Sequence, residues 1–122
     1  MSTMSDDNDP LIGEFFTPYP EVDRVRLYTS TFEGHIAEDH REVYENVGLK
    51  GIELTVSNPD FVYSGSNTRS VVFERNNVFE GKNLQVPVKI VKGTSGRIRT
   101  AFLTRTSKTK PYEIIWRKDN VD

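Results

Sequence analysis

The chain has 122 residues, of which 35% are hydrophobic and 28% are charged, and this composition suits one folded domain with a modest core. It contains no cysteine, which excludes a disulfide scaffold, a thiolate zinc site and a cysteine nucleophile. Its uncharged apolar runs are only a few residues long, so no segment is expected to cross a membrane. We expect a disordered acidic tail over residues 1–10, unlike a secretory leader, and a single domain over residues 11–122.

The net charge of −2 conceals a strong division between the two halves of the chain. Residues 1–60 carry four Lys and Arg against thirteen Asp and Glu, whereas residues 61–122 carry twelve against five. Between Gly81 and Tyr112 there are eight basic residues and no carboxylate. This asymmetry predicts either a basic face that attracts a polyanion through counterion release, or two halves that neutralise each other in the fold.

Two elements are predicted ahead of the first helix. Residues 11–20 are rich in aromatic side chains and proline, and we expect them to pack as an irregular arm on the domain. Residues 24–29 alternate in the manner of a strand, with Val25 and Leu27 on one face.

One helix is predicted over residues 31–46. Ser30 and Glu33 fit a capping box at its start, and Gly48 supplies a C-terminal stop. Its apolar stripe contains Ile36, His40, Val43, Tyr44 and Val47.

The remainder of the chain predicts strands separated by turns. The strands are expected at residues 52–56, 70–75, 84–90, 97–105 and 112–117, with turns at 58–60 and 93–96 and a polar basic loop at 105–111. Residues 61–63 either extend the first of these strands or begin a bend, and Pro87 indicates a sheet edge or a bulge. The pattern predicts an α+β architecture, in which an N-terminal arm and helix precede a four-stranded or slightly larger, mainly antiparallel sheet.

His35 and His40 are the histidines of the chain, and both lie on the predicted helix. Five residues correspond to about 140° around a helix axis, so the two side chains should not share a face or form a helical metal pair. Imidazole titrates near neutral pH and can accept and donate a proton. His40 is therefore either a core-edge histidine or a catalytic group, and His35, on the side of Asp39 and Glu42, is either an ordinary exposed residue or a catalytic group.

A second candidate segment covers residues 97–102. On a strand, Arg97, Arg99 and Ala101 would share one face, and Ile98, Thr100 and Phe102 would share the other. Thr100 interrupts an otherwise apolar face. Its hydroxyl is expected either to bond to the backbone or to face a cleft or a buried partner.

Several segments taken in order resemble the phage-associated barnase–EndoU–colicin–RelE (BECR) nuclease superfamily. They are His35-Ile-Ala-Glu-Asp-His40-Arg-Glu42, Ile52-x-x-x-Val56-x-Asn58-Pro59-Asp60-x-Val62, Leu84-x-Val86-x-Val88-Lys89 and Arg99-Thr100-Ala101-Phe102. The likeness spans roughly residues 24 to 105, and Arg41 stands where the superfamily pattern usually has proline.

The resemblance implies a helix followed by a four-stranded antiparallel sheet, and a metal-independent endoribonuclease that needs no cofactor and is often deployed as a toxin. It implies that the catalytic residues are His35, His40, Arg99 and Thr100. One histidine would take the proton of a ribose 2′-hydroxyl, while Arg99, Arg97 or Lys89 would stabilise charge on the phosphoryl oxygens.

Further expectations concern binding and location. The expected substrate-binding residues are Tyr63, Arg69, Lys89, Arg97, Lys108 and Lys110. The expected partners are RNA, with tRNA as one candidate, and a cognate immunity protein or antitoxin, in the cytoplasm of a bacterium or phage-infected host. The alternative is a catalytically inactive, phage-encoded binding or inhibitor module that recognises a protein or a nucleic acid.

Overall fold

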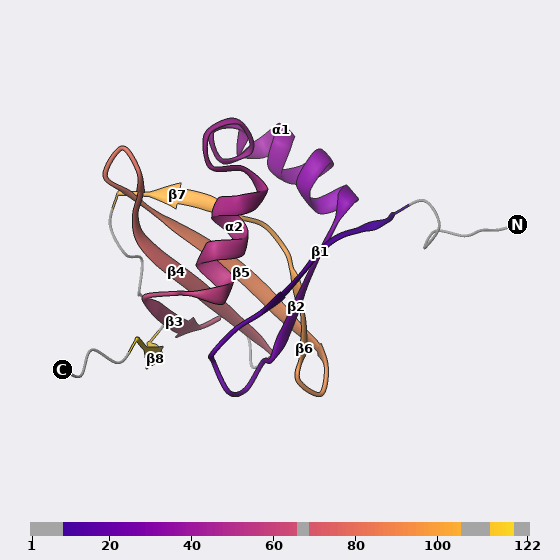
Figure 1. The fold of residues 1–122 in the computed structure, drawn as a ribbon, viewed down its shortest axis with the longest axis vertical. Coiled ribbons are helices and arrows are strands. Elements are labelled where there is room, and N and C mark those ends of the chain that lie inside the picture. Colours follow the sequence, from indigo (N-terminus) through magenta and orange to yellow (C-terminus); the bar gives the residue numbers. More distant parts are fainter. Residues whose placement is uncertain (1–8, 66–68, 106–112, 119–122) are drawn as a thin grey trace, which may run out of the picture.

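The computed structural model describes residues 9–65, 69–105 and 113–118, and within them eight strands form a single sheet (Figure 1). The strands are β1 (Leu11–Phe16), β2 (Arg24–Tyr28), β3 (Phe61–Ser64), β4 (Ser70–Phe79), β5 (Lys82–Lys92), β6 (Ser95–Ile98), β7 (Phe102–Thr104) and β8 (Ile114–Arg117). Their order is β1-β2-β6-β5-β4-β3-β8, with β7 paired to β5, and every pairing except β2–β6 is antiparallel. The predicted α+β class and mainly antiparallel sheet are confirmed, but the sheet of eight strands is larger than the four or slightly more strands expected.

The predicted first helix is interrupted at His40. It consists of the π-helical segment η1 (Ser30–Ile36), α1 (Ala37–Asp39) and the π-helical segment η2 (Val43–Val47). His40 leaves the helical conformation, with φ −135° and ψ 58°. The chain therefore turns at His40, which changes the direction of this side chain relative to His35.

The second helix, α2 (Gly48–Ser57), replaces the strand predicted at residues 52–56. Ile52, Thr55 and Val56 are buried at the i, i+3, i+4 spacing of a helix, whereas Leu54 is exposed. Apolar residues at positions 52, 54 and 56 also fit a strand period, so the spacing alone favoured the wrong element. Packing of α2 against β1, β4 and β5 stabilises the helix instead.

The N-terminal expectations also need correction. Residues 11–16 form the edge strand β1 rather than an irregular arm, and Phe15 is buried. Asp9, assigned to a disordered tail, accepts hydrogen bonds from Ser30 N and Ser30 Oγ, each at 2.8 Å. The predicted capping box is wrong, because the Ser30 hydroxyl bonds to Asp9 and makes no cap hydrogen bond. Residues 1–8 lie outside the described part of the chain.

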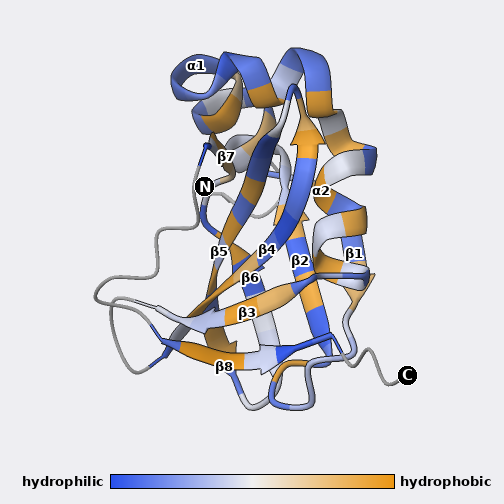
Figure 2. Cartoon of the chain, turned by 90° about the vertical axis from the view of Figure 1, so that its left-hand side faces the viewer, coloured by the Kyte–Doolittle hydropathy of each residue, from blue (hydrophilic) through white to orange (hydrophobic). Residues whose placement is uncertain are grey.

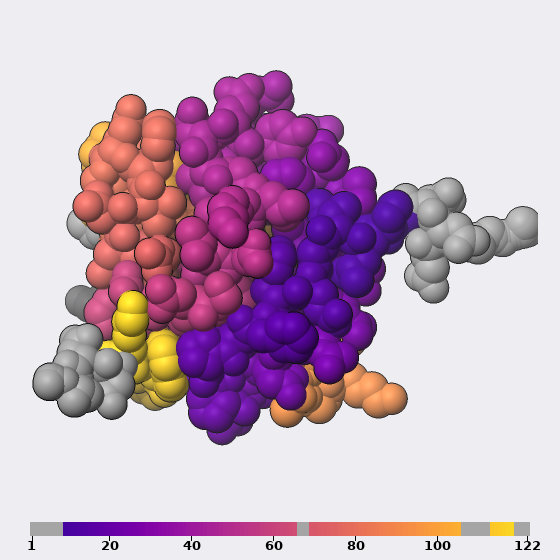
Figure 3. All heavy atoms as spheres, in the orientation of Figure 1, coloured from indigo at the N-terminus to yellow at the C-terminus, as the bar shows by residue number. Residues whose placement is uncertain are grey.

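The sheet has two unlike faces. The helices cover one face. Figure 2 shows α2 lying along that side of the sheet, and in Figure 3 the α2 region lies beside the N-terminal strands. The core lies beneath them, with Val25, Leu27, Phe73, Leu84, Val86, Val88 and Ile98 on its sheet side. The opposite face is called the second face below. It carries every other side chain of the central strands, and these side chains are cross-strand neighbours: Ser70, Val72 and Glu74 of β4, Gln85, Pro87 and Lys89 of β5, and Arg97 of β6. Among the described residues, no helix is long and apolar enough to span a membrane.

The predicted strand at residues 97–105 is split by a bulge. β6 pairs Ile98 with Val88, and β7 pairs Phe102 with Gln85. The three residues 99–101 therefore face only Val86 and Pro87, which leaves one residue extra. Pro87 lies on a central strand and not on an edge, and the bulge lies opposite it.

Candidate functional site

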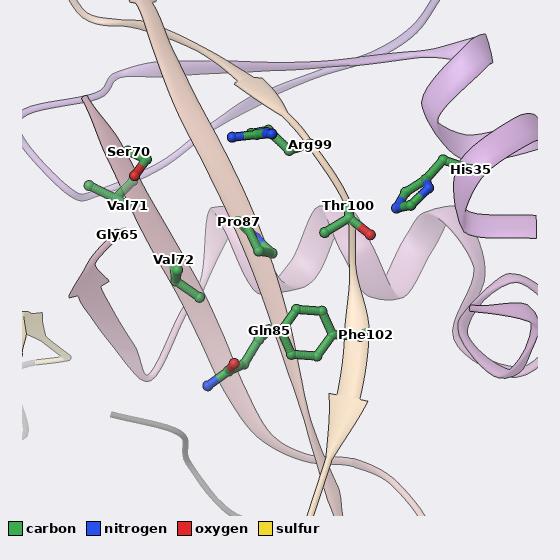
Figure 4. Close-up of a pocket in the computed structure, with 10 residues that line it drawn as sticks. All are labelled: His35, Gly65, Ser70, Val71, Val72, Gln85, Pro87, Arg99, Thr100 and Phe102. Atoms are coloured by element: carbon green, nitrogen blue, oxygen red, sulfur yellow. The ribbon is translucent and has the colours of Figure 1, made fainter. Parts of the chain in front are cut away.

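A cleft of about 390 Å³ opens on the second face. Helix η1 contributes His35 to it, the bulge contributes Arg99 and Thr100, and strand β7 contributes Phe102 (Figure 4). The remaining wall residues are Gly65, Ser70, Val71, Val72, Gln85 and Pro87. Three of the four predicted catalytic residues therefore line one cleft, although they come from two distant segments of the chain.

His35 points from η1 toward Thr100 (Figure 4). Its side chain is 44% exposed, and its Nδ1 lies 2.9 Å from Asp39 Oδ2, one helical turn later. A carboxylate is an acceptor when ionised, so this contact places a proton on Nδ1 and leaves the Nε2 lone pair of the neutral ring available. This arrangement suits His35 to accept a proton from a group bound in the cleft.

His40 packs beside His35, contrary to the prediction that the two histidines point about 140° apart. The ring centroids are 5.4 Å apart, and the His40 ring lies 5.9 Å from that of Phe102. The prediction assumed a continuous helix, whereas His40 is at the break. Burial lowers the pKa of His40 below its ordinary value, and the neighbouring His35 contributes to the decrease.

The bulge positions Arg99 and Thr100. The Arg99 backbone N–H donates to Pro87 O at 2.9 Å, which holds the bulged chain against β5. Thr100 Oγ1 is buried and has no hydrogen-bond partner among the described residues. Ile98 and Ala101 enter the core, so the simple alternation predicted for residues 97–102 is wrong. A buried hydroxyl without a partner is costly, and a bound phosphate oxygen would satisfy it.

The predicted substrate-binding residues have different locations. Lys89 and Arg97 are exposed cross-strand partners on the second face, and the Arg97 guanidinium lies 4.4 Å from the Tyr28 ring centroid. Arg97 also lies 3.5 Å from Asp9 Oδ2. Arg69 is exposed at the start of β4, next to the wall residue Ser70.

The other three predicted substrate-binding residues are Tyr63, Lys108 and Lys110. Tyr63 is only 1% exposed, and its hydroxyl donates to Glu74, so it is not a surface for base stacking. Lys108 and Lys110 lie outside the described residues.

Sequence reasoning placed His35 on the side of Asp39, and the structure shows these two side chains in contact. It missed Gln85 as a wall residue. Gln85 is a polar residue inside an apolar strand, where it faces Glu74 on the neighbouring strand. That cross-strand pairing is not visible in the sequence.

Among the described residues, no three His, Cys, Asp or Glu side chains are grouped so that they could hold a metal ion. Comparisons with protein-family models, curated proteins and solved structures found no match.

Proposed function

We propose that this protein is a metal-independent endoribonuclease that cleaves RNA through attack of a ribose 2′-hydroxyl. The observation that supports this proposal most strongly is that His35, Arg99 and Thr100 line one cleft, with His40 packed against His35. Phosphoryl transfer to a neighbouring oxygen is assisted by a proton acceptor and by a cation beside the phosphoryl oxygens, and a hydroxyl can donate a further hydrogen bond to them.

His35 acts as the general base in this proposal. Its Nε2 takes the 2′-hydroxyl proton, the freed oxygen attacks the adjacent phosphorus, and the bond from phosphorus to the 5′-oxygen breaks. The products are a 2′,3′-cyclic phosphate and a 5′-hydroxyl, whose proton comes from water in the open cleft. Asp39 holds His35 in the required tautomer and stabilises the imidazolium that forms.

Arg99 and Thr100 stabilise the phosphoryl group. Arg99 supplies positive charge to the phosphoryl oxygens, and it has no ion-pair partner among the described residues. Thr100 Oγ1 donates to one of these oxygens and gains the partner that it lacks in the unbound protein.

His40 is a positioning residue. Because burial lowers its pKa, its ring is neutral near pH 7 and places no second positive charge beside the His35 imidazolium. Its contacts with His35 and Phe102 hold the helix end against β7.

RNA, with tRNA as one candidate, is the proposed substrate. Lys89 is the cross-strand partner of both the wall residue Ser70 and Arg97, so this basic pair adjoins the cleft and suits a phosphate backbone. The ordered motifs further support membership of the BECR superfamily, a toxin-like role with a cognate immunity protein or antitoxin, and a cytoplasmic location in a bacterium or infected host.

The test is to incubate the purified protein with total RNA in excess EDTA. We expect cleavage to persist, His35→Ala to abolish it, and an oligonucleotide with deoxyribose at the cut position to bind and remain whole. Strict dependence on added magnesium or zinc, or equal cleavage of the deoxyribose substrate, would contradict the mechanism. Binding of RNA or protein without any cleavage would instead favour the inactive binding module.

A further inference from the structure

A row of cross-strand partners leads from the cleft across the second face to the N-terminal strands. Lys89 of β5 has the wall residue Ser70 of β4 on one side and Arg97 of β6 on the other. Arg97 is the partner of Arg26 on β2, and Arg26 is the partner of Glu14 on β1. Cross-strand partners point to the same face and strands lie about 4.8 Å apart, so the row extends about 19 Å from the cleft wall to β1. It is long enough for several nucleotides, which rise about 3.4 Å each in a stacked strand.

Positive charge exceeds negative charge along this row. Glu14 Oε2 lies 3.0 Å from Arg26 Nε and 3.6 Å from the Nε of Arg24, which precedes Arg26 by two positions on the same face. Asp9 Oδ2 lies 3.5 Å from Arg97 Nη2. Three arginines therefore share two carboxylates, and the lysine of the row has no ion-pair partner among the described residues. The arginine side chains are between 39% and 46% exposed, and exposed ion pairs are weak, so a phosphate group can replace either carboxylate.

Two aromatic rings lie among these arginines. Phe16 of β1 is the partner of Arg24 and is 63% exposed, and the Arg24 guanidinium carbon lies 5.8 Å from its ring centroid. Tyr28 follows Arg26 by two positions on β2 and points to the same face, where the Arg97 guanidinium lies 4.4 Å from its ring centroid. Rings and guanidinium planes at one surface can stack with unpaired bases, and the same guanidinium groups can bind phosphates.

These features favour a single-stranded nucleic acid over other polyanions. The bases of a duplex are paired and stacked on one another, so their faces cannot reach rings on a sheet surface. An acidic peptide of Asp and Glu matches the charge but offers no planar bases to the two rings. A single strand offers both phosphates and free bases.

We infer that strands β1, β2 and β6, with Lys89 of β5, form a platform for single-stranded RNA that continues from the cleft. In this N-terminal platform the phosphates are bound by Arg24, Arg26, Lys89 and Arg97, and the bases stack on Phe16 and Tyr28. The inference rests on the proposed function, because the strand on the platform is the part of the substrate that leaves the cleft. It assigns the substrate to unpaired RNA of several nucleotides, without selection of one base.

The stacking contact is tested by binding, so that the result does not depend on cleavage. A deoxyribose strand of about ten nucleotides is compared by fluorescence anisotropy with an abasic strand of the same length and charge. Phe16→Ala should weaken binding of the first strand about tenfold, within the range for one lost base–aromatic stack, and leave the abasic strand unaffected. Leu54→Ala, which removes an exposed apolar side chain from α2, should change neither affinity. Equal losses for both strands, or no loss, would overturn the stacking contact.

The phosphate contacts are tested by removing a carboxylate that competes with them. Glu14→Gln releases Arg24 and Arg26, so binding of the same strand should become severalfold tighter and its salt dependence steeper. Glu45→Gln is the matched control, because Glu45 is also paired with an arginine, at 2.8 Å from Arg41, but lies on the helical side. Equal tightening in the two variants would show an effect of net charge alone and would overturn the assignment of Arg24 and Arg26.

The identity of the ligand is tested by comparing three polyanions of similar charge. We expect the single strand to bind more tightly than a duplex of the same sequence and more tightly than a peptide of glutamate residues. A duplex or a glutamate peptide that binds as tightly as the single strand would overturn the platform for single-stranded RNA.

The outcomes also separate the platform from the ribonuclease activity. Single-strand binding that depends on Phe16 and Glu14 as expected, without RNA cleavage, supports the platform and overturns the proposed function. RNA cleavage with unchanged affinity in Phe16→Ala and Glu14→Gln overturns the platform and leaves the ribonuclease in place. Absence of both strand binding and cleavage overturns both.

Discussion

At the scale of single residues, Arg97 and Arg99 are only two positions apart, yet they lie in different surroundings. Arg97 lies on regular strand β6, over Tyr28 and close to Asp9. Arg99 lies in the bulge and lines the cleft. The one extra residue between β6 and β7 is therefore what places Arg99 at the cleft while Arg97 stays on the strand surface.

This difference predicts opposite kinetic effects for two matched substitutions. On the proposed mechanism, Arg99→Gln should lower kcat by about 100-fold at saturating RNA, because it would remove a group that acts on the transition state. Arg97→Gln should raise KM and change kcat little, because Arg97 would contact RNA outside the cleft. Steady-state kinetics on a short RNA measure both, and equal losses of kcat in the two variants would contradict the assignment of Arg99.

The pKa of His40 predicts a pH dependence of stability. Its pKa is lowered in the folded protein, so between the folded and unfolded pKa values the unfolded chain binds more protons. His40 therefore contributes stability when its ring is neutral. This stability is fully present above the unfolded pKa of about 6.5 and is lost as the pH falls through the pKa of the folded protein. The free energy of unfolding of the wild type should thus decrease from pH 7.5 to pH 5.

His40→Gln removes this group and should flatten the decrease. Denaturant unfolding of both proteins at the two pH values measures the effect. The same decrease in wild type and variant would show that His40 is not the titrating group.

At the scale of elements, Gly48 separates the first helical region from α2. Its φ of 72° and ψ of −175° lie in a region that is essentially restricted to glycine, and this conformation redirects the chain so that α2 crosses the sheet. The sequence predicted Gly48 as a helix stop but placed a strand after it. The stop is confirmed, and the following element is a helix.

Gly48→Ala should lower the free energy of unfolding by about 1–3 kcal/mol through backbone strain. An added Cβ would meet no heavy atom within 4 Å, so no steric clash contributes. Gly34→Ala is the matched control, since its added Cβ is equally free and its φ is not positive. We expect that control to be neutral or stabilising by up to about 1 kcal/mol, and an equal loss in both variants would exclude strain at Gly48 as the cause.

At the scale of the whole molecule, the charge asymmetry of the sequence is divided between the two sides of the sheet. The helical side carries Glu33, Glu38, Glu42, Glu45 and Glu53, whereas Lys89, Arg97 and Arg99 lie on the second face or at the cleft. Some of this charge is neutralised locally, as in the 2.7 Å contact of Lys82 with Glu42. Lys89 and Arg99 have no such partner among the described residues.

Lys89, which has no ion-pair partner among the described residues, predicts a salt dependence of nucleic-acid binding. Lys89→Gln should reduce the slope of log affinity against log salt by about one, because one phosphate contact and its released counterion are lost. Lys50→Gln on α2 removes the same charge from the opposite side and should leave the slope unchanged. Anisotropy titrations with a 2′-deoxy oligonucleotide measure both, and equal slopes for Lys89→Gln and the wild type would contradict a phosphate contact at Lys89.

The sequence by itself determined the α+β class, the strands β2, β4, β5 and β8 and the approximate helix around His35. It left β3 open and expected β6 and β7 as one strand. The elements that it determined depend on local patterns, because period-two alternation and turn residues are short-range signals. It also indicated His35, Arg99 and Thr100 as chemically unusual residues, from their types and from the motifs in which they occur.

Only the tertiary structure decided the helical state of α2, the proximity of the two histidines and the composition of the cleft. Residues 52–56 fit two periods equally well, and burial against the sheet selects the helix. The contact between His35 and His40 depends on a helix break, and the position of Thr100 depends on the register on both sides of the bulge. Strand register and packing are set by contacts between distant segments, so no local pattern could have placed Gln85 beside Glu74.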